Sequence, residues 1–416
     1  MWDWDVDAHI KNYWKKIDEA GAAFFEKQLN ELEYRKYGGS RTEFYNPDDD
    51  HPMRLALFLS FLDVTPLEEA MKQFYRRPAS IKYLGSMGRT LVFMKVEGWT
   101  PGQTVNYLKT HPVDAELFGY DRKMDGSYEV PCGETIRLNL KNRFGVEGVK
   151  MIDRGIVVVM RIAAEALGID LGECYGSDAF PVKSVGSDNN AEYNAHYDVH
   201  GYKVATTESY NPEIGIVPLV GDVIGINDNE GDLLIPHIQE LKSCGIHVKE
   251  NFVDGKYATI SNIAQAEIIE GTLLHYDIAE NWVYDYTATP YSIKTEYQKF
   301  HHEPDFLVNA SEDFMMKYLV KKGCYGTVGY MLRNIHMAAK EECPDGYMDH
   351  FHRRNITESE NDYIKNDSGL QRVIRRRGKE NIQLQFHFTL LALHVVALVR
   401  LQNGCKKHLV SKRGLT

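Results

Sequence analysis

The chain has 416 residues, of which 43% are hydrophobic, and it carries a formal net charge of −11 with a pI near 5.8. This length is enough for two or three domains with substantial cores. The acidic balance argues against a protein that coats nucleic acid non-specifically, because such proteins show a basic surface. The six cysteines are widely spaced and form no C-x-x-C pair, which argues against a zinc finger and against a disulfide scaffold.

The N-terminal region, residues 1–168, is predicted to be an all-α domain for DNA binding and assembly. Its segments pair a capping or turn residue with apolar residues spaced three or four apart. Residues 98–120 fit a helix-turn-helix that docks on DNA, but small helical bundles produce the same pattern, so both interpretations stay open. The predicted helices cover residues 50–62, 65–75, 86–96, 100–109 and 133–144.

From about residue 170 the pattern predicts an α/β domain over residues 169–403. Three strands separated by polar turns are predicted first, and then a helix, a strand, a helix and a strand. This order resembles a ribonuclease H-like mixed sheet flanked by helices. A mostly helical insertion is expected at about 285–350, with a less regular stretch at 291–314. The predicted elements are strands 173–185, 197–209 and 215–226, helix 232–245, strand 246–254, helix 259–270 and strand 271–279.

The two ends of the chain predict a cytoplasmic, nucleoid-associated protein with no membrane span. Residues 1–14 are acidic and lack the apolar core of a secretory signal. The apolar run at 388–401 is too short to span a bilayer and predicts a buried helix. From residue 351 onward, 13 Lys and Arg stand against 5 Asp and Glu, a balance of +8 that leaves −19 on the preceding residues. This asymmetry favours a basic working surface near the C-terminus, although a solvated helix face with a basic tail at 404–416 gives the same balance.

Two aspartates in the predicted sheet have the placement of a magnesium site. Asp178 lies in the first strand and Asp254 ends the fourth, and these strands are neighbours in the expected order. Phosphoryl transfer with two metal ions requires carboxylates that converge from different elements. The alternatives to Asp178 are Asp188, in a stretch that predicts a turn, and Asp198. The alternatives to Asp254 are Asp222, Asp228 and Asp232, of which the last two lie in a predicted loop.

A third acid is predicted in the stretch FHRRNITESENDYIK, residues 351–365. On a helix, Phe351, Arg354, Glu358 and Lys365 fall within an arc of about 60°, whereas Glu360 points to the opposite side. Glu358 therefore shares its face with two cations, as suits a site that receives a polyanion. Asp362 also lies on this face and is a reserve candidate. An exposed Arg354–Glu358 pair is the structural alternative, but its order along the helix is the less favourable one.

The remaining candidates are a histidine pair and an arginine run. His350 and His352 lie two residues apart, but no Cys or third His stands at zinc-ligand spacing. Arg375, Arg376 and Arg377 follow the predicted catalytic helix, so they are candidates for contact with DNA phosphates. A plain basic surface is the alternative for that run.

Together these residues resemble the acidic triad of insertion-sequence DDE transposases. Asp178 in GSDAF, Asp254 in VDGKY and the spacing F-(2)-R-(3)-E-(6)-K match that pattern, and the last element is similar to the Y-R-E-K signature of one large branch. Phe351 departs from it, because tyrosine is usual there. The Arg-rich turn and apolar helix of residues 369–402 also look like the end of such proteins.

The resemblance implies a transposase that binds the ends of its own element and cuts and rejoins DNA with Mg²⁺, for which Mn²⁺ would substitute. Asp178, Asp254 and Glu358 would hold the metal ions, and Arg354 and Lys365 would contact phosphates near the cut. Two ends are processed together, so a homodimer assembled on DNA is expected. The alternatives are a nuclease of the same fold that does not transfer strands, and a non-catalytic DNA-binding derivative.

Overall fold

The structure is a computed structural model that describes residues 59, 84–142, 146–184, 188–279, 281–300, 310–351, 378–402 and 409–410. The chain divides into two compact units. The helical unit comprises Met1–Leu167, Ser368–Leu370 and Glu380–Thr416, and the sheet unit comprises Gly168–Asp367 and Gln371–Lys379. The two units are described separately below.

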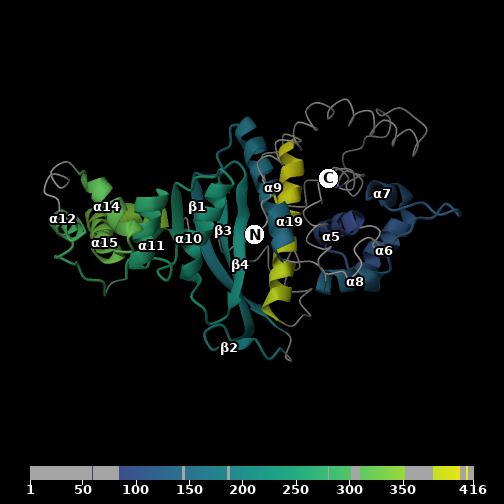
Figure 1. Ribbon diagram of the computed structural model, residues 1–416, viewed down its shortest axis with the longest axis horizontal. Helices are drawn as coiled ribbons and strands as arrows, with labels where there is room; N and C mark the ends of the chain where they lie inside the picture. The colour runs from purple at the N-terminus through teal and green to yellow at the C-terminus, as the bar shows by residue number, and fades with distance from the viewer. Residues whose placement is uncertain are drawn as a thin grey trace. The chain divides into compact units, whose positions relative to one another are not determined.

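Six helices of the helical unit are described, and their apolar side chains share one core with Leu59. The long helices α9 and α19 lie side by side (Figure 1), and the buried His394 of α19 contacts Asp153 of α9 at 2.7 Å. The helices predicted at 86–96, 100–109 and 133–144 are confirmed, whereas those at 50–62 and 65–75 lie outside the described residues, apart from Leu59. The helices are α5 (Leu84–Glu97), α6 (Pro101–Thr110), α7 (Pro112–Leu117), α8 (Gly133–Asn142), α9 (Val146–Ala166) and α19 (Lys379–Gln402).

Helices α6 and α7 show why the segment 98–120 folds as two short helices. Thr100 and Gln103 form a reciprocal capping box at the start of α6, and Pro101 occupies its first turn. His111 ends α6, and Pro112 starts α7 directly after it. The helix pair is therefore specified locally, and its contact with DNA stays a prediction.

Helix α19 confirms the buried helix predicted at 388–401. Of the described helices, this one is long and apolar enough to cross a membrane by length and composition, and 89% of its apolar window, Lys379–Leu398, is buried inside the protein. The domain predicted from the sequence, 169–403, joined this helix to the sheet, but its core side chains belong to the cluster of α5, α8 and α9. Leu409 and Val410, within the predicted basic tail, are also buried.

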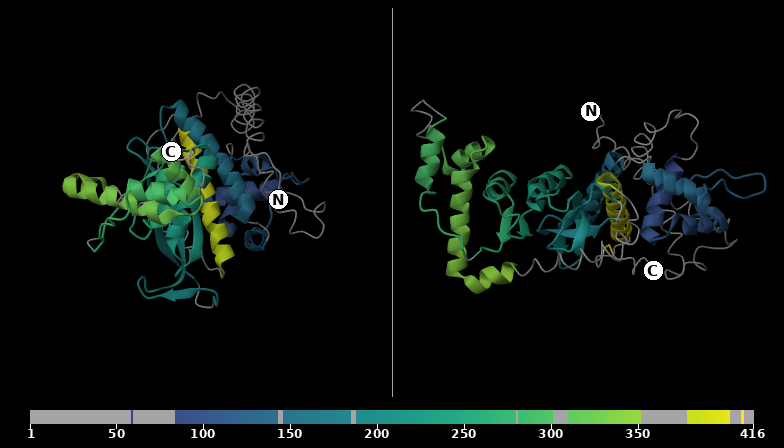
Figure 2. Two further views of the ribbon diagram at one scale, coloured as in Figure 1. Left: turned by 60° about the vertical axis from the view of Figure 1, so that its left-hand side comes forward. Right: turned by 90° about the horizontal axis from the view of Figure 1, so that it is seen from below.

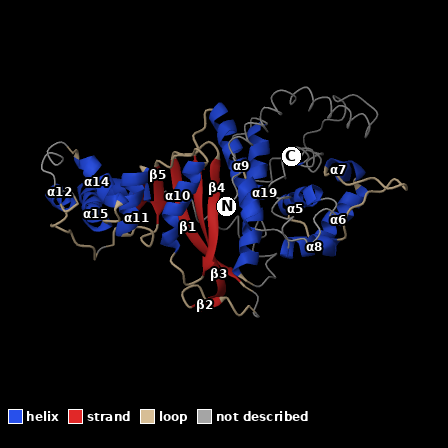
Figure 3. Ribbon diagram, viewed as in Figure 1, coloured by secondary structure: helices blue, strands red, loops and turns tan. Residues whose placement is uncertain are grey.

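The sheet unit is built on a six-stranded mixed sheet. Its long path runs β4–β3–β1–β5–β6, and the short β2 pairs with the start of β3. The pairs β1/β3 and β3/β4 are antiparallel, whereas β1/β5 and β5/β6 are parallel. Helix α10 covers one face of this sheet (Figure 3). The strands are β1 (Cys174–Lys183), β2 (Glu192–Asn194), β3 (Val199–Asn211), β4 (Gly215–Gly225), β5 (Glu250–Val253) and β6 (Leu273–Tyr276).

Helices surround the sheet and continue beyond β6, where the helical insertion is predicted. A second core joins α10 and the residues after β5 to α12, α14 and α15, and α14 packs beside α15 (Figure 2). Gly329 of α15 allows α11 a close approach, because a Cβ there would lie 2.3 Å from the carbonyl oxygen of Ile260. The helical elements are η2 (Glu230–Leu233), α10 (Leu234–Ser243), α11 (Ile260–Ala264) with its π-helical continuation η3 (Gln265–Glu270), α12 (Pro290–Gln298), α14 (Glu312–Lys321), α15 (Tyr325–Glu342) and α16 (Pro344–Phe351).

The predicted strands and helices of this unit are confirmed with shifted ends, and one segment needs a correction. The stretch expected to be less regular, 291–314, contains most of helix α12. Thr289 caps this helix with a capping box that includes Ser292, and Pro290 stands in its first turn. These local signals outweigh the weak apolar periodicity of the segment.

Candidate active site

Asp178 and Asp254 meet on neighbouring strands at the centre of the sheet. In the parallel pair β1/β5, Ser177 stands opposite Val253, and each aspartate is the next residue along its strand. Neighbouring strands lie about 4.8 Å apart, and residues at one level of a parallel pair point to the same face. The register therefore brings the two carboxylates side by side.

Ser177, the residue before Asp178, belongs to a buried polar network that holds this part of the sheet together. The hydroxyl groups of Ser177 and Thr207 lie 2.9 Å apart, and Asn251 Nδ2 donates to Ser177 Oγ at 3.0 Å. Thr207 also contacts Nδ1 of His237 on α10 at 3.0 Å, and Nε2 of His237 lies 3.5 Å from Asp222. Side chains alternate along a strand, so Ser177 anchors the face covered by α10 while Asp178 is directed to the other face.

The loop after β5 fixes the position of Asp254. Its Oδ1 accepts a hydrogen bond from the backbone N–H of Gly255 at 2.6 Å, and its carbonyl accepts one from Tyr257 at 2.9 Å. Asn262 Nδ2 donates to the carbonyl oxygens of Gly231 and Tyr257, both at 2.8 Å. This amide ties the Asp254 loop to η2.

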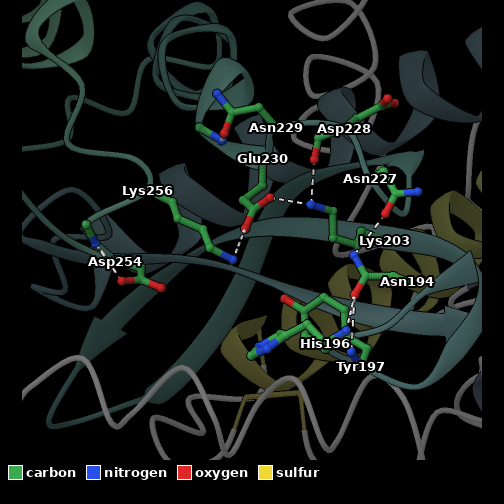
Figure 4. A network of polar contacts seen from close by, with 12 residues as sticks. Asn194, His196, Tyr197, Lys203, Asn227, Asp228, Asn229, Glu230, Asp254 and Lys256 are labelled. Carbon is green, nitrogen blue, oxygen red and sulfur yellow. Dashed lines mark hydrogen bonds and ion pairs between the residues drawn. The ribbon is translucent and has the colours of Figure 1, made fainter.

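Glu230 of η2 brings a further carboxylate to this region, where two lysines hold it (Figure 4). Lys203 of β3 and Glu230 form a buried ion pair, and Lys256 Nζ lies 3.3 Å from the other oxygen of Glu230. Burial acts to raise the pKa of Glu230, but the hydrogen bonds and charges of the two lysines outweigh it, so this pKa lies below its usual value. Gly231 permits the close approach, because a Cβ there would lie 2.6 Å from the carbonyl oxygen of Lys256.

Tyr257 places a buried hydroxyl group among the acids. Its side chain is almost fully buried, and within the described residues its hydroxyl has no hydrogen-bond partner. Burial raises the pKa of Tyr257 well above its usual value, and the negative charges of Asp178, Glu230 and Asp254 raise it further. The charges of these three carboxylates therefore all act on one phenol.

A pocket of about 630 Å³ opens beside Asp254. Tyr197 and Lys256 both line it. Burial raises the pKa of Tyr197, the charge of Lys256 lowers it, and Glu230, Asp178 and Asp254 raise it, which places the phenol near all four groups. The lining residues are Asn194, His196, Tyr197, Lys203, Ile226, Asn227, Asp228, Asn229, Glu230, Asp254 and Lys256.

Asp188, the first alternative to Asp178, lies in a different environment. Its carboxylate is buried and accepts hydrogen bonds from the hydroxyls of Ser184 at 2.7 Å and Tyr202 at 3.2 Å, and from the backbone N–H groups of Asn190 at 3.1 Å and Gly378 at 2.7 Å. Burial acts to raise the pKa of Asp188, but the four donors outweigh it and leave this pKa below its usual value. Four donors already satisfy this carboxylate, which indicates a structural role.

The other alternative aspartates also make local contacts. Asp198 adopts a positive φ of 50° and accepts from the hydroxyl of Tyr193 at 2.8 Å. Asp228 accepts from the N–H of Gly225 at 2.7 Å, and Asp232 accepts from Asn229 at 2.8 Å. These bonds are those of turn-forming residues.

The third acid and the basic residues predicted from the sequence lie outside the described residues. Over the part of the chain that the structure describes, no group of three His, Cys, Asp or Glu could hold a metal ion. The structure thus brings together two members of the predicted triad. The undescribed residues are Glu358, Glu360, Asp362, Arg354, Lys365, Arg375, Arg376 and Arg377, with His352 and the side chain of His350.

The sequence predictions did not include Lys203, Glu230, Lys256 or Tyr257 as members of the site. One signal was available for Lys203, because a lysine within an otherwise uncharged stretch of a central strand requires a buried counter-charge. Glu230 lies in the loop NDNEGD, whose composition predicts only a turn. Its partner is 27 residues away in the sequence, so only the tertiary fold shows the pair.

No protein-family model and no curated protein matches this chain.

Proposed function

We propose that this chain is a DNA transposase that binds the ends of its mobile element and catalyses metal-dependent strand cleavage and strand transfer. The observation that supports this most directly is the register of β1 and β5, which sets Asp178 beside Asp254. Carboxylates on adjacent strands at the centre of a mixed sheet are what phosphoryl transfer with two metal ions requires.

The sheet order gives independent support. If the five longer strands are numbered along the chain, their spatial order is 3-2-1-4-5, and only the last two connections are parallel. Helix α10 follows the third long strand and α11 follows the fourth, and the ribonuclease H-like fold is part of this proposal. Many functions share one fold, so the aspartates carry more weight than the order.

The donor set fits magnesium, which takes oxygen ligands. Asp178 and Asp254 would hold the ions together with Glu358. Bound Mg²⁺ supplies Lewis-acid stabilisation of the charge that develops on the phosphoryl oxygens. Mn²⁺ would bind to the same oxygen ligands.

The protein's own residues would position the DNA around that centre. The network of Ser177, Thr207 and Asn251 holds β1 and β5 in register, so the two aspartates keep their spacing. Arg354 and Lys365 would contact phosphates near the cut, and Arg375, Arg376 and Arg377 would contact phosphates farther along the strand. A dimer assembled on two DNA ends would process both together.

The test is cleavage of a supercoiled plasmid that carries the DNA flanking the gene, with Mg²⁺ or Mn²⁺. We expect Glu358→Gln to abolish nicking and Glu360→Gln, the matched control, to cut like the wild type. If both variants cut like the wild type, the assignment of the third acid is wrong. Joined products in which a DNA end enters a target strand distinguish a transposase from a nuclease, and binding without cleavage would indicate a non-catalytic derivative.

A further inference from the structure

The pocket beside Asp254 contains three asparagines whose side chains are already used in holding loops. Asn194 Oδ1 accepts from the backbone N–H groups of His196 and Tyr197, at 2.9 and 3.2 Å. Asn227 Nδ2 donates to Glu192 at 2.9 Å, and Asn229 Nδ2 donates to Asp232 at 2.8 Å. The hydrogen bonds of these amides hold the loops that form the pocket wall.

Three other side chains that line the pocket, Lys256, Tyr197 and His196, are less constrained by hydrogen bonds than the asparagines. Lys256 has a side chain that is 54% exposed and a single contact to Glu230 at 3.3 Å. Within the described residues the side chains of Tyr197 and His196 make no hydrogen bond, and their rings contact each other edge to face at 4.8 Å. Polar groups that can reach a ligand in the pocket therefore come from these three side chains.

The charges around Glu230 leave Lys256 as a surplus cation. Glu230 is buried, and the buried Lys203 already neutralises it. Stabilisation of Glu230 is a weak reason for a second, half-exposed lysine, since such pairs contribute about 0–1 kcal/mol. Of the acids that line the pocket, Asp228 is directed to the N–H of Gly225, and Asp254 belongs to the proposed metal centre. The pocket wall thus offers one half-exposed cation that the neutralisation of Glu230 does not require.

We infer that Lys256 and Tyr197 form a subsite for a backbone phosphate of the DNA strand, adjacent to the phosphate that reacts at Asp178 and Asp254. This inference rests on the proposed function and specifies how its substrate strand is held. Lys256 and Asp254 line the same pocket, so a strand that reaches Asp254 through this pocket passes the lysine. The ammonium group supplies a charged contact, and the Tyr197 phenol supplies a neutral donor.

The experiment measures DNA binding without cleavage, in EDTA, by fluorescence anisotropy of a labelled duplex with the sequence that flanks the gene. The plot of log K against log salt concentration has a negative slope, and loss of one phosphate contact makes this slope shallower by about 0.9. We expect this reduction for Lys256→Gln, restoration by Lys256→Arg, and several-fold weaker binding for Tyr197→Phe at an unchanged slope.

Lys249 provides a matched control. It is exposed and paired with Asp170 at 2.7 Å, and it directly precedes β5, whereas Lys256 follows that strand. We expect Lys249→Gln to keep the wild-type slope. Thermal unfolding of each variant checks that the fold is intact.

The possible failures can be told apart. If Lys256→Gln keeps the wild-type slope while Asp178→Asn still abolishes plasmid cleavage, the subsite is wrong and the proposed function stands. If the wild type neither binds nor cuts the DNA, both proposals fail. If inorganic phosphate binds to the wild type but not to Lys256→Gln, and displaces DNA no more strongly than chloride does at equal ionic strength, the pocket takes free phosphate and the strand subsite is wrong.

Discussion

Two G-S-D tripeptides, at residues 176–178 and 186–188, end in aspartates with opposite surroundings. Asp188 accepts hydrogen bonds from four donors and is buried among them. Asp178 stands in the middle of β1 beside Asp254, and Glu230 lies near the same phenol. Four donors stabilise the carboxylate of Asp188 as a structural anion, whereas Asp178 lies beside a second aspartate on the neighbouring strand, an arrangement that can supply oxygen ligands to a metal ion. The neighbours of each aspartate, which the tripeptide does not specify, separate a structural acid from a candidate metal ligand.

The largest effect is expected from Asp178→Asn. The substitution keeps the side-chain shape but removes a negative ligand from the proposed metal centre. Even the partners of metal ligands contribute about 10–100-fold to metal affinity or activity, so we expect plasmid nicking to fall by more than about 100-fold. Urea denaturation of the variant checks that the loss of nicking does not come from unfolding. Activity near the wild-type level would contradict the assignment of Asp178.

The next largest effect is expected from Lys203→Met. This substitution leaves Glu230 buried with only the half-exposed Lys256 as a partner. Removal of one member of a buried ion pair costs about 3–5 kcal/mol of the free energy of unfolding, measured by urea denaturation. Lys256→Met is the control, and it should cost less than about 1 kcal/mol. Equal costs would mean that Lys256 stabilises Glu230 as much as Lys203 does, which would also remove the basis for the phosphate subsite.

Asp188→Asn is the counterpart of Asp178→Asn, and its effect should fall on stability. An amide has one acceptor oxygen, whereas a carboxylate has two, so at least one of the four donors loses its acceptor. We expect this loss to reduce the free energy of unfolding by about 1–3 kcal/mol. We expect the folded variant to nick plasmid at the wild-type rate. If Asp188→Asn abolished nicking without loss of stability, the roles of the two aspartates would be reversed.

The order of the sheet elements and the position of the two aspartates could be predicted from sequence, because both depend on local patterns. In residues 170–279, the spacing of apolar and polar residues and the turn-forming residues between segments specify each element. Asp254 lies where a strand pattern ends at a glycine. Helix α12 was missed because its capping box signals a start without a clear apolar period. These are properties of short segments.

The neighbours of the aspartates could not be predicted, because they depend on contacts between distant segments. The Asp188 cradle includes the N–H of Gly378, which is 190 residues away, and no sequence period reports that contact. In the same way, the sequence around Asp188 predicts only a turn, whereas the structure shows the four donors that hold its carboxylate. Tertiary contacts therefore carry the information that distinguishes function from structure here.

The pH dependence of stability gives the smallest and most specific effect. The pKa of Asp188 is lowered in the folded protein, so its stabilising contribution is fully present above its unfolded pKa of about 4 and is lost as the pH falls through the folded value. Asp170 and Glu230 also have lowered pKa values, but they contribute equally to the wild type and to Asp188→Asn. The difference in unfolding free energy between these two proteins should therefore be constant above about pH 5 and should shrink below about pH 4. Urea denaturation over a pH series measures this difference. A constant gap at acid pH would show that the four donors do not favour the charged form of Asp188, and the contrast with Asp178 would then lose its electrostatic basis.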